Sequence, residues 1–336
     1  MADAADLKSA EQTLVWVRLP PPPPMEGKVP VSYIGSLVNR FYGKRRDEVL
    51  IDASYLTDSA VVDLDAPIVV STDPITGADS SVVTQLAVHV NANDVRVAGG
   101  EPVAFLAVIL LPTNFPQEYL ESMFEHLHAG LNYENAQLVG GHSEFTPAVN
   151  KPVVIGTMFG KRIRELSKEF VKPSQHVFFA GTLGQEAMML LKGSYSHDIL
   201  KVSVKPIMDV VLNAPSLVFA HDLTEGGLVA GLWELTRGTS LGINALFPED
   251  FLDDELIELS HRFGFNPYKI ISSGSVLLVC ENKQELTHRL EKDHVPFVYL
   301  GELKQNCATS LNGVPLDRLD PEGPDELWTL QSGLST

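Results

Sequence analysis

Short apolar runs alternate with stretches of helical spacing along most of this chain, and that alternation limits what it can fold into. PVAFLAVILLP (102–112) and HVFFAG (176–181) indicate buried strands, because apolar residues dominate them and proline or glycine closes each run. Between these runs, Leu120, Phe124 and Leu131 belong to a set of apolar residues with helical spacing. Alternating strands and helices predict an α/β fold, built as α+β layers, rather than a helical bundle.

Two features divide the chain into parts. LPPPPPM (19–25) is a polyproline spacer that cannot join a helix, so the residues before it form a tail outside the main fold. Charge rises in KRIRELSKEFVKPSQ (161–175), and the pattern of strands and helices restarts after it. We therefore predict a tail at 1–27, an N-terminal domain at 28–162, a linker at 163–175 and a C-terminal domain at 176–330.

HVNANDV (89–95) places an aspartate on the apolar stripe of a predicted helix. Leu86, Val90, Asp94 and Ala98 recur every four residues and therefore share one face of that helix. A carboxylate that is buried without a partner costs several kcal/mol or gives up its charge. Either a neighbouring helix or loop donates a hydrogen bond to Asp94, or a cation compensates it.

Three further aspartates stand at strand ends or in loops. Asp58 opens DSAVV, Asp73 ends IVVSTD just before Pro74, and Asp222 ends LVFAHD. Carboxylates at strand ends around one helix carboxylate form the oxygen-rich type of site that hard divalent cations prefer. From the spacing alone, a metal site and ordinary hydrogen-bonded acids both remain open.

Glycine pairs occur at 99–100, 140–141 and 226–227, close to these acids. Glycine lets the backbone approach a ligand and present N–H groups to phosphate, although each pair is also compatible with a simple turn. None fits GxxxxGK[ST] or GxGxxG, which argues against Walker ATPases and Rossmann dehydrogenases. His142 and His221 lie beside acidic residues and could move protons or only hydrogen-bond the backbone.

The charge balance excludes some classes of partner. The net charge is −18, from 25 basic and 43 acidic residues, which argues against binding nucleic acid or anionic membranes. A bound nucleotide would need a cation between its phosphates and these carboxylates. The tight basic cluster GKRR (43–46) is either a solvated surface turn or a phosphate clamp.

Cysteine usage and the N-terminus bear on location. Cys280 and Cys307 have no CxxC or histidine cluster beside them, so no disulfide framework is indicated, and Cys280 ends an apolar run as a small buried hydrophobe would. The N-terminus lacks the basic and apolar regions of a signal peptide, and no apolar run is long enough to span a bilayer. We expect a cytoplasmic protein.

Taken in chain order, several motifs resemble the aminoimidazole-ribonucleotide (AIR) synthase superfamily. They are most similar to its synthase-related and hydrogenase-maturation (HypE-type, carbamoyl-dehydrating) branches, and the similarity covers roughly residues 28–328. The motifs are TDPITG, AVHVNANDV, VGGHSEFTP, VVIGTMFG, HDLTEGGL and SSGSVLLV. The resemblance implies an N-terminal α/β domain that pairs with its twin across a dimer barrel, and a C-terminal α/β domain. It also implies ATP and Mg²⁺ in the cleft between the two domains.

The resemblance further implies roles for individual residues. Aspartates of the family that bind metal match this chain's Asp58, Asp73 and Asp94, and a loop that faces the nucleotide matches its GGHS segment. The C-terminal domain's active-site aspartate matches Asp222. We therefore expect metal binding by Asp58, Asp73 and Asp94, nucleotide binding by Asn93, Gly140, Gly141, Ser143, Gly226 and Gly227, and catalytic roles for His142 and Asp222.

Chemistry shared by the family is phosphoryl transfer from ATP to an oxygen, often of an amide or carbonyl. The usual GEDAAV of the family is LTDSAVV here, which keeps Asp58 but not its Glu and Gly neighbours, and HypE proteins end in a cysteine whereas this chain ends LQSGLST. We expect a homodimeric Mg²⁺- and ATP-dependent phosphoryl-transfer enzyme that acts on a small molecule. The alternative is a catalytically degenerate protein that binds nucleotide, or only a partner protein, and assists maturation or regulation.

Overall fold

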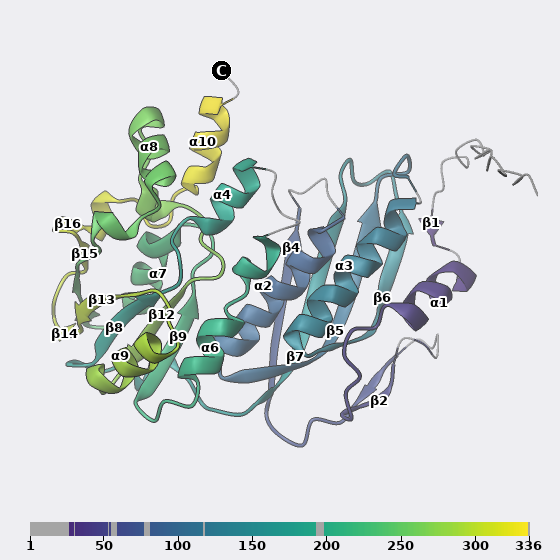
Figure 1. The fold of residues 1–336 in the computed structure, drawn as a ribbon, viewed down its shortest axis with the longest axis horizontal. Coiled ribbons are helices and arrows are strands. Elements are labelled where there is room, and N and C mark those ends of the chain that lie inside the picture. Colours follow the sequence, from purple (N-terminus) through teal and green to yellow (C-terminus); the bar gives the residue numbers. More distant parts are fainter. Residues whose placement is uncertain are drawn as a thin grey trace, which may run out of the picture.

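Two sheets with their helices lie side by side in the computed structural model (Figure 1). The structure describes residues 27–29, 31–52, 54, 59–76, 81–116, 118–192 and 198–334. The predicted tail up to residue 26 and Asp58 lie outside these ranges. The expected α/β fold with two domains is confirmed, and the limits of the domains remain a prediction.

The larger sheet belongs to the N-terminal domain and has the strand order β1-β6-β5-β7-β4. Only β5 and β6 are parallel; the other neighbouring pairs are antiparallel. The expected apolar run at 102–112 forms the central strand β5, where both of its faces can be covered. The strands are β1 (Gly27–Lys28), β4 (Ile68–Ile75), β5 (Gly100–Leu111), β6 (Gln137–Phe145) and β7 (Val153–Arg162).

Helices α2 (Val83–Val97) and α3 (Glu118–Glu134) cover one face of this sheet, and α1 (Val31–Arg40) packs beside α3 (Figure 1). In α3, the apolar residues that predicted the helix are all buried, because their spacing places them on one face toward the sheet. They are Leu120, Met123, Phe124, Leu127 and Leu131.

The opposite face of the larger sheet is only partly covered. Strands β2 (Val49–Ile51) and β3 (Val61–Val62) pair with each other and pack against part of it. On the edge strand β4, Ile68 and Val70 remain 57% and 53% exposed on this face. Because side chains alternate along a strand, Asp73 points to the other face, toward α2.

The smaller sheet forms the C-terminal domain and is antiparallel throughout, in the order β13-β8-β12-β9. Its central strands are apolar and almost completely buried. The strands are β8 (His176–Ala180), β9 (Leu217–Asp222), β12 (Val276–Cys280) and β13 (Phe297–Glu302). The helices are α4 (Gln185–Lys192), α6 (Lys205–Val211), α7 (Gly227–Thr236), α8 (Asp254–Phe263), α9 (Lys283–Lys292) and α10 (Glu326–Leu334).

Shorter elements complete this domain. Small strands are β10 (Leu241–Gly242), β11 (Asn244–Ala245), β14 (Lys304–Gln305), β15 (Ser310–Leu311) and β16 (Val314–Pro315). Single 3₁₀ turns are η2 (Lys168–Phe170), η3 (Ile199–Val202), η4 (Glu249–Phe251), η5 (Pro267–Lys269) and η6 (Leu316–Arg318). No helix in the described ranges is both long and apolar enough to cross a bilayer.

The charged stretch predicted as a linker (163–175) is bonded to the C-terminal domain. The Arg164 guanidinium donates to four carbonyls of residues 212–217, just after α6, at 2.5–3.1 Å. Lys168 Nζ donates to the carbonyls of Glu234 and Arg237 at the end of α7. Both cations therefore bind backbone carbonyls at or soon after the C-terminal end of a helix, where the helix dipole favours positive charge.

Helix α2 lies against both domains. Leu86 and Val90 of its predicted stripe pack on Met189 and Val202 of the C-terminal domain. The same helix contacts strands β4, β5 and β7 of its own sheet and the end of β9. Asp94, the next residue on that stripe, therefore lies at the interface between the domains.

Candidate functional site

Three aspartates meet where α2 lies between the two domains. Asp94 is on α2, Asp73 is on β4, and Asp222 ends β9. The Ser71 hydroxyl donates to Asp94 Oδ2 and lies 3.5 Å from Asp73 Oδ2. The Asp73 backbone N–H donates to Asn91 Oδ1 on α2 at 2.9 Å, which fixes the strand against the helix. The structure therefore brings Asp73, Asp94 and Asp222 together across the domain interface.

Burial and mutual repulsion keep the pKa values of Asp94 and Asp222 above the usual range of an aspartate. Burial, followed by the nearby carboxylates of Asp222 and Asp73, raises the pKa of Asp94 to about 8, although the Ser71 hydrogen bond lowers it. Burial also raises the pKa of Asp222, against the opposing effect of His221. In the described ranges, no Lys or Arg forms an ion pair with any of the three aspartates. A proton or a bound cation must therefore compensate them.

The donor set fits a hard divalent cation. Asp73, Asp94 and Asp222 offer only oxygen atoms, and Asp222 Oδ2 is buried with no hydrogen-bond partner among the residues that the structure describes. Among the described residues, no three His, Cys, Asp or Glu side chains are arranged to hold a metal ion on their own. An ion here would need further oxygens, and Mg²⁺ commonly takes these from water and phosphate.

Asn93, expected to contact nucleotide, has other partners. Its side chain is fully buried, donates to the Val202 carbonyl at 2.8 Å and accepts from the Val204 N–H at 2.9 Å. Both of its polar atoms are therefore used between the domains. No local pattern could predict these bonds, because the partners lie more than a hundred positions further along the chain.

The prediction of a glycine loop at GGHS is wrong. Gly140, Gly141 and Ser143 are part of the continuous strand β6. At Gly141, φ is +148° and a Cβ atom would lie 1.9 Å from the carbonyl oxygen of Ala107 on β5. This glycine is therefore required by close approach of two strands.

His142 lies on the far side of the sheet from the aspartates. Its neighbours across β5, β7 and β4 are Val108, Ile155 and Pro74, which share its face. Asp73, next to Pro74, points to the opposite face. His142 instead pairs with Glu144 at 2.9 Å.

The glycine pair at the start of α7 makes a tight turn whose first N–H is occupied. Gly226 N donates to Asp325 Oδ2 at 2.6 Å, and a Cβ on Gly227 would lie 2.5 Å from the Ile270 carbonyl oxygen. Asp325 is buried and also accepts from Leu327 N at the start of α10. Sequence reasoning missed Asp325, whose only local signal is its position before a helix.

The cluster GKRR lies at the surface, where Lys44 and Arg45 are exposed, but both of its arginines are paired. Arg46 pairs with Glu48 at 2.9 Å and Glu101 at 3.0 Å, and Arg45 pairs with Asp52 at 2.6 Å. Both arginines therefore form their ion pairs with acidic residues of the N-terminal domain.

Cys280 and Cys307 are both free thiols. Cys280 is buried at the end of β12, as expected of a small hydrophobe, and burial raises the pKa of its thiol to about 12. A thiol with so high a pKa stays protonated and is a poor nucleophile.

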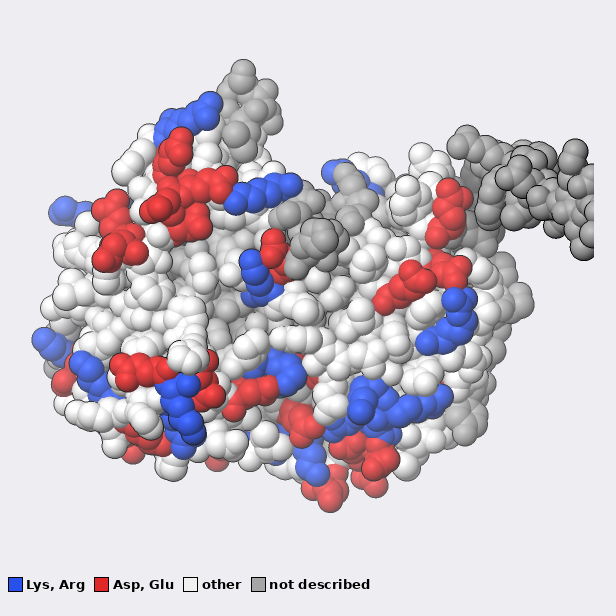
Figure 2. Space-filling view, in the orientation of Figure 1, with Lys and Arg blue, Asp and Glu red and all other residues white. Residues whose placement is uncertain are grey.

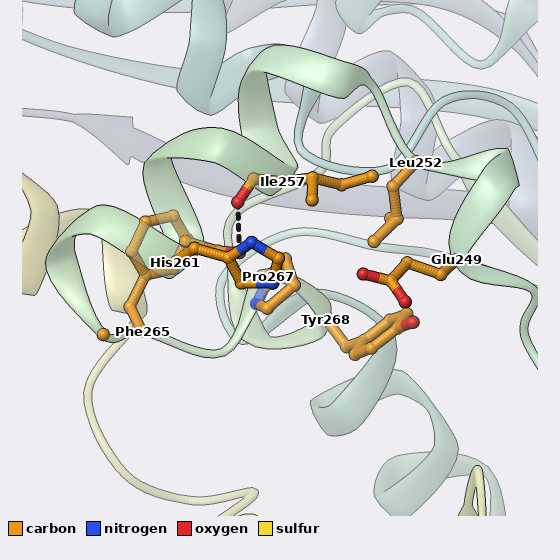
Figure 3. A pocket seen from close by; sticks show the side chains of 9 residues that line it. Glu249, Leu252, Ile257, His261, Phe265, Pro267 and Tyr268 are labelled. Atoms are coloured by element: carbon orange, nitrogen blue, oxygen red, sulfur yellow. Dashed lines mark hydrogen bonds between the residues drawn. The ribbon is translucent and has the colours of Figure 1, made fainter.

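A separate cavity of about 440 Å³ opens between η4, α8 and η5 of the C-terminal domain (Figure 3). Leu252, Ile257 and Phe265 line it, with Tyr268 and the Glu249 carboxylate close together at one side. Figure 2 shows acidic side chains gathered at this end of the molecule. None of the residues expected to carry function lines this cavity.

Comparison with known proteins places the chain in a structural context. Residues 56–162 match the family model for the N-terminal domain of AIR synthase related protein. Hydrogenase expression/formation protein HupE of Azotobacter chroococcum mcd 1 is 23% identical over 220 residues, which are 60% of this chain and 62% of HupE. Less than two thirds of that relative's length is therefore matched.

Two further comparisons extend the match. Thiamine-monophosphate kinase of Aquifex aeolicus (strain VF5) is 24% identical over 250 residues, covering 70% of this chain and 78% of the kinase. A crystal structure of hydrogenase maturation protein HypE in complex with ATP superposes with a TM-score of 0.67 at 18% identity, covering 76% of this chain and 85% of that one. The resemblance expected from the motifs is confirmed: residues 56–162 match the N-terminal domain of AIR synthase related protein, and the chain has the two-domain fold of the HypE structure.

Proposed function

We propose that this protein transfers a phosphoryl group from Mg²⁺-bound ATP to an oxygen of a small carbonyl- or amide-type substrate. The observation that carries the proposal is the group of Asp73, Asp94 and Asp222, with which no Lys or Arg of the described ranges forms an ion pair. Two similar proteins support it, because the HypE structure was solved with ATP and another relative is a kinase.

Within this proposal, Asp73 and Asp94 hold Mg²⁺ together with Asp58, and Ser71 orients the Asp94 carboxylate. When bound, the ion neutralises phosphate charge and stabilises charge that develops on the transferred group. This matters in a chain with a net charge of −18, whose carboxylates repel a free triphosphate. Asp222, which comes from the other domain and whose Oδ2 has no hydrogen-bond partner among the described residues, would act on the oxygen that accepts the phosphoryl group.

We also propose that the protein is a homodimer in which a second copy covers the open face of the larger sheet. Ile68 and Val70 are exposed there, which is unusual for large apolar residues on a sheet. His142 and Glu144 lie on this same face. They would therefore face the partner copy rather than the aspartates of their own chain. The nucleotide-binding roles expected for Gly140, Gly141 and Ser143 stay predictions.

Thermal unfolding with a non-hydrolysable ATP analogue tests the cation site. The analogue with Mg²⁺ should raise the melting temperature, because a ligand at a hundred times its Kd stabilises the folded state by about 2.7 kcal/mol. The analogue alone should have little effect, and Asp94→Asn should abolish the difference that Mg²⁺ makes. Equal effects with and without Mg²⁺ would show that the aspartates do not bind a nucleotide-bound cation.

A second candidate is a nucleotide- or partner-binding protein without turnover, of the kind that assists maturation or regulates. The occupied N–H of Gly226 favours it, since the α7 turn then offers less to a phosphate group. ADP formation across a panel of carbonyl- and amide-containing metabolites separates the two. Acceleration by one metabolite identifies an enzyme, and binding without turnover across the panel identifies the second function.

A further inference from the structure

Three consecutive residues of the C-terminal domain are bonded to the N-terminal domain beside the aspartates. The Val202 carbonyl and the Val204 N–H both pair with the Asn93 side chain, at 2.8 and 2.9 Å. Between them, Ser203 Oγ donates to Glu134 Oε1 at 2.6 Å. All of these groups are buried, so water could not replace any of these hydrogen bonds if it were lost.

Glu134 is a buried acid whose carboxylate accepts three side-chain hydrogen bonds. It accepts from His89 Nδ1 at 2.7 Å and from Arg96 Nε at 2.9 Å, in addition to Ser203. Although burial raises the pKa of Glu134, these hydrogen bonds and charges lower it below its usual range. Glu134 therefore stays ionised and gives the Ser203 hydroxyl a strong acceptor.

The same turn of α2 carries these bonds and Asp94. Asn93 directly precedes Asp94, and Arg96 follows it by two positions. Asp222 belongs to the other domain. The separation of Asp94 from Asp222 is therefore set by how residues 202–204 dock on this turn.

We propose that Asn93, Glu134 and Ser203 form an interdomain clamp that positions Asp222 against Asp73 and Asp94 for binding of a divalent cation. The inference rests on the proposed function of the aspartates. Cation coordination requires its ligands to be held within about 0.5 Å of the productive geometry. Residues that hold metal ligands from behind usually change metal affinity by 10- to 100-fold when they are replaced.

Ser203→Ala tests the clamp, because it removes one hydroxyl and leaves the backbone bonds to Asn93 in place. Its control is Thr84→Val, which removes a buried hydroxyl of α2 that is bonded to the Met123 carbonyl at 2.6 Å within the N-terminal domain. The readouts are the melting temperature, the Kd for Mn²⁺ alone, and the Kd for the non-hydrolysable ATP analogue with and without Mg²⁺.

We expect Ser203→Ala to weaken Mn²⁺ binding and Mg²⁺-dependent nucleotide binding about tenfold, while Mg²⁺-independent nucleotide binding is unchanged. Thr84→Val should lower the melting temperature to a similar degree without changing either cation-dependent Kd. Wild-type affinities in Ser203→Ala would overturn the clamp and leave the proposed function standing. Failure of the wild type to bind Mn²⁺ or the Mg²⁺–nucleotide complex would overturn both.

Discussion

Asp94→Asn should stabilise the metal-free protein at pH 8. In the folded protein the pKa of Asp94 is about 8, against 3.8 for an ordinary aspartate. A raised folded-state pKa adds stability that is complete below pH 3.8 and is lost as the pH rises toward 8. At about 1.4 kcal/mol per pKa unit, three pH units between pH 5 and pH 8 correspond to a loss of up to about 4 kcal/mol.

Asparagine removes this loss because it carries no charge and keeps an acceptor for the Ser71 hydroxyl. Thermal unfolding is followed by circular dichroism from pH 5 to pH 8.5 in a chelating buffer. The melting temperature of the wild type should fall more steeply than that of Asp94→Asn. Glu186, whose pKa is also raised by burial, is present in both proteins and cancels in the comparison.

Asp317→Asn is the matched control, because Asp317 is an exposed acid of η6 and its loss changes the net charge equally. This control should follow the wild type at every pH. Excess Mg²⁺ should flatten the wild-type curve, since the ion favours the ionised carboxylates, and should leave Asp94→Asn unchanged. Parallel curves for the wild type and Asp94→Asn would refute the idea that Asp94 is a poorly compensated acid.

Three further substitutions examine other contacts. Val70→Lys places a charge on the open sheet face and should convert the proposed dimer to a monomer in light scattering, whereas a wild-type monomer would rule out the dimer. Glu134→Ala leaves Arg96 and His89 buried without their carboxylate acceptor and should lower the free energy of unfolding by about 3–5 kcal/mol. The control Glu121→Ala should lower it by at most about 1 kcal/mol, because its partner Arg40 is exposed. Similar losses for both variants in thermal unfolding would contradict this prediction. Asp325→Ala removes the acceptor of two backbone N–H groups and should lower the free energy of unfolding by about 1–3 kcal/mol. Asp317→Asn should leave the free energy of unfolding unchanged.

The parts of the fold that follow from local pattern were predictable. The stripe of α3 is local, because residues three and four positions apart share a face whatever lies opposite. Asp94 could be singled out for the same reason, since a charged residue on such a stripe needs a partner.

Contacts between distant segments were not predictable. Nucleotide binding by Asn93 was expected from its place in the family motif. Its hydrogen-bond partners lie 109 and 111 positions away and leave no local trace in the sequence. Gly140 and Gly141 were expected in a loop because glycine permits both a turn and a close approach. Only the position of the Ala107 carbonyl opposite Gly141 decides between the two.

The two buried acidic sites around α2 are compensated in opposite ways. Glu134 receives hydrogen bonds from His89, Arg96 and Ser203, so the fold supplies everything its charge requires. On the same turn of α2 as Arg96, Asp94 receives a single hydrogen bond from the Ser71 hydroxyl and lies beside two more carboxylates. Helix α2 supplies an arginine and a histidine to Glu134, so basic side chains can be accommodated beside a buried acid in this part of the fold. Because it does not do so at Asp94, we infer that this charge is kept for a cation from outside the chain, and a nucleotide-bound Mg²⁺ is the ion that suits both the oxygen donors and so acidic a protein.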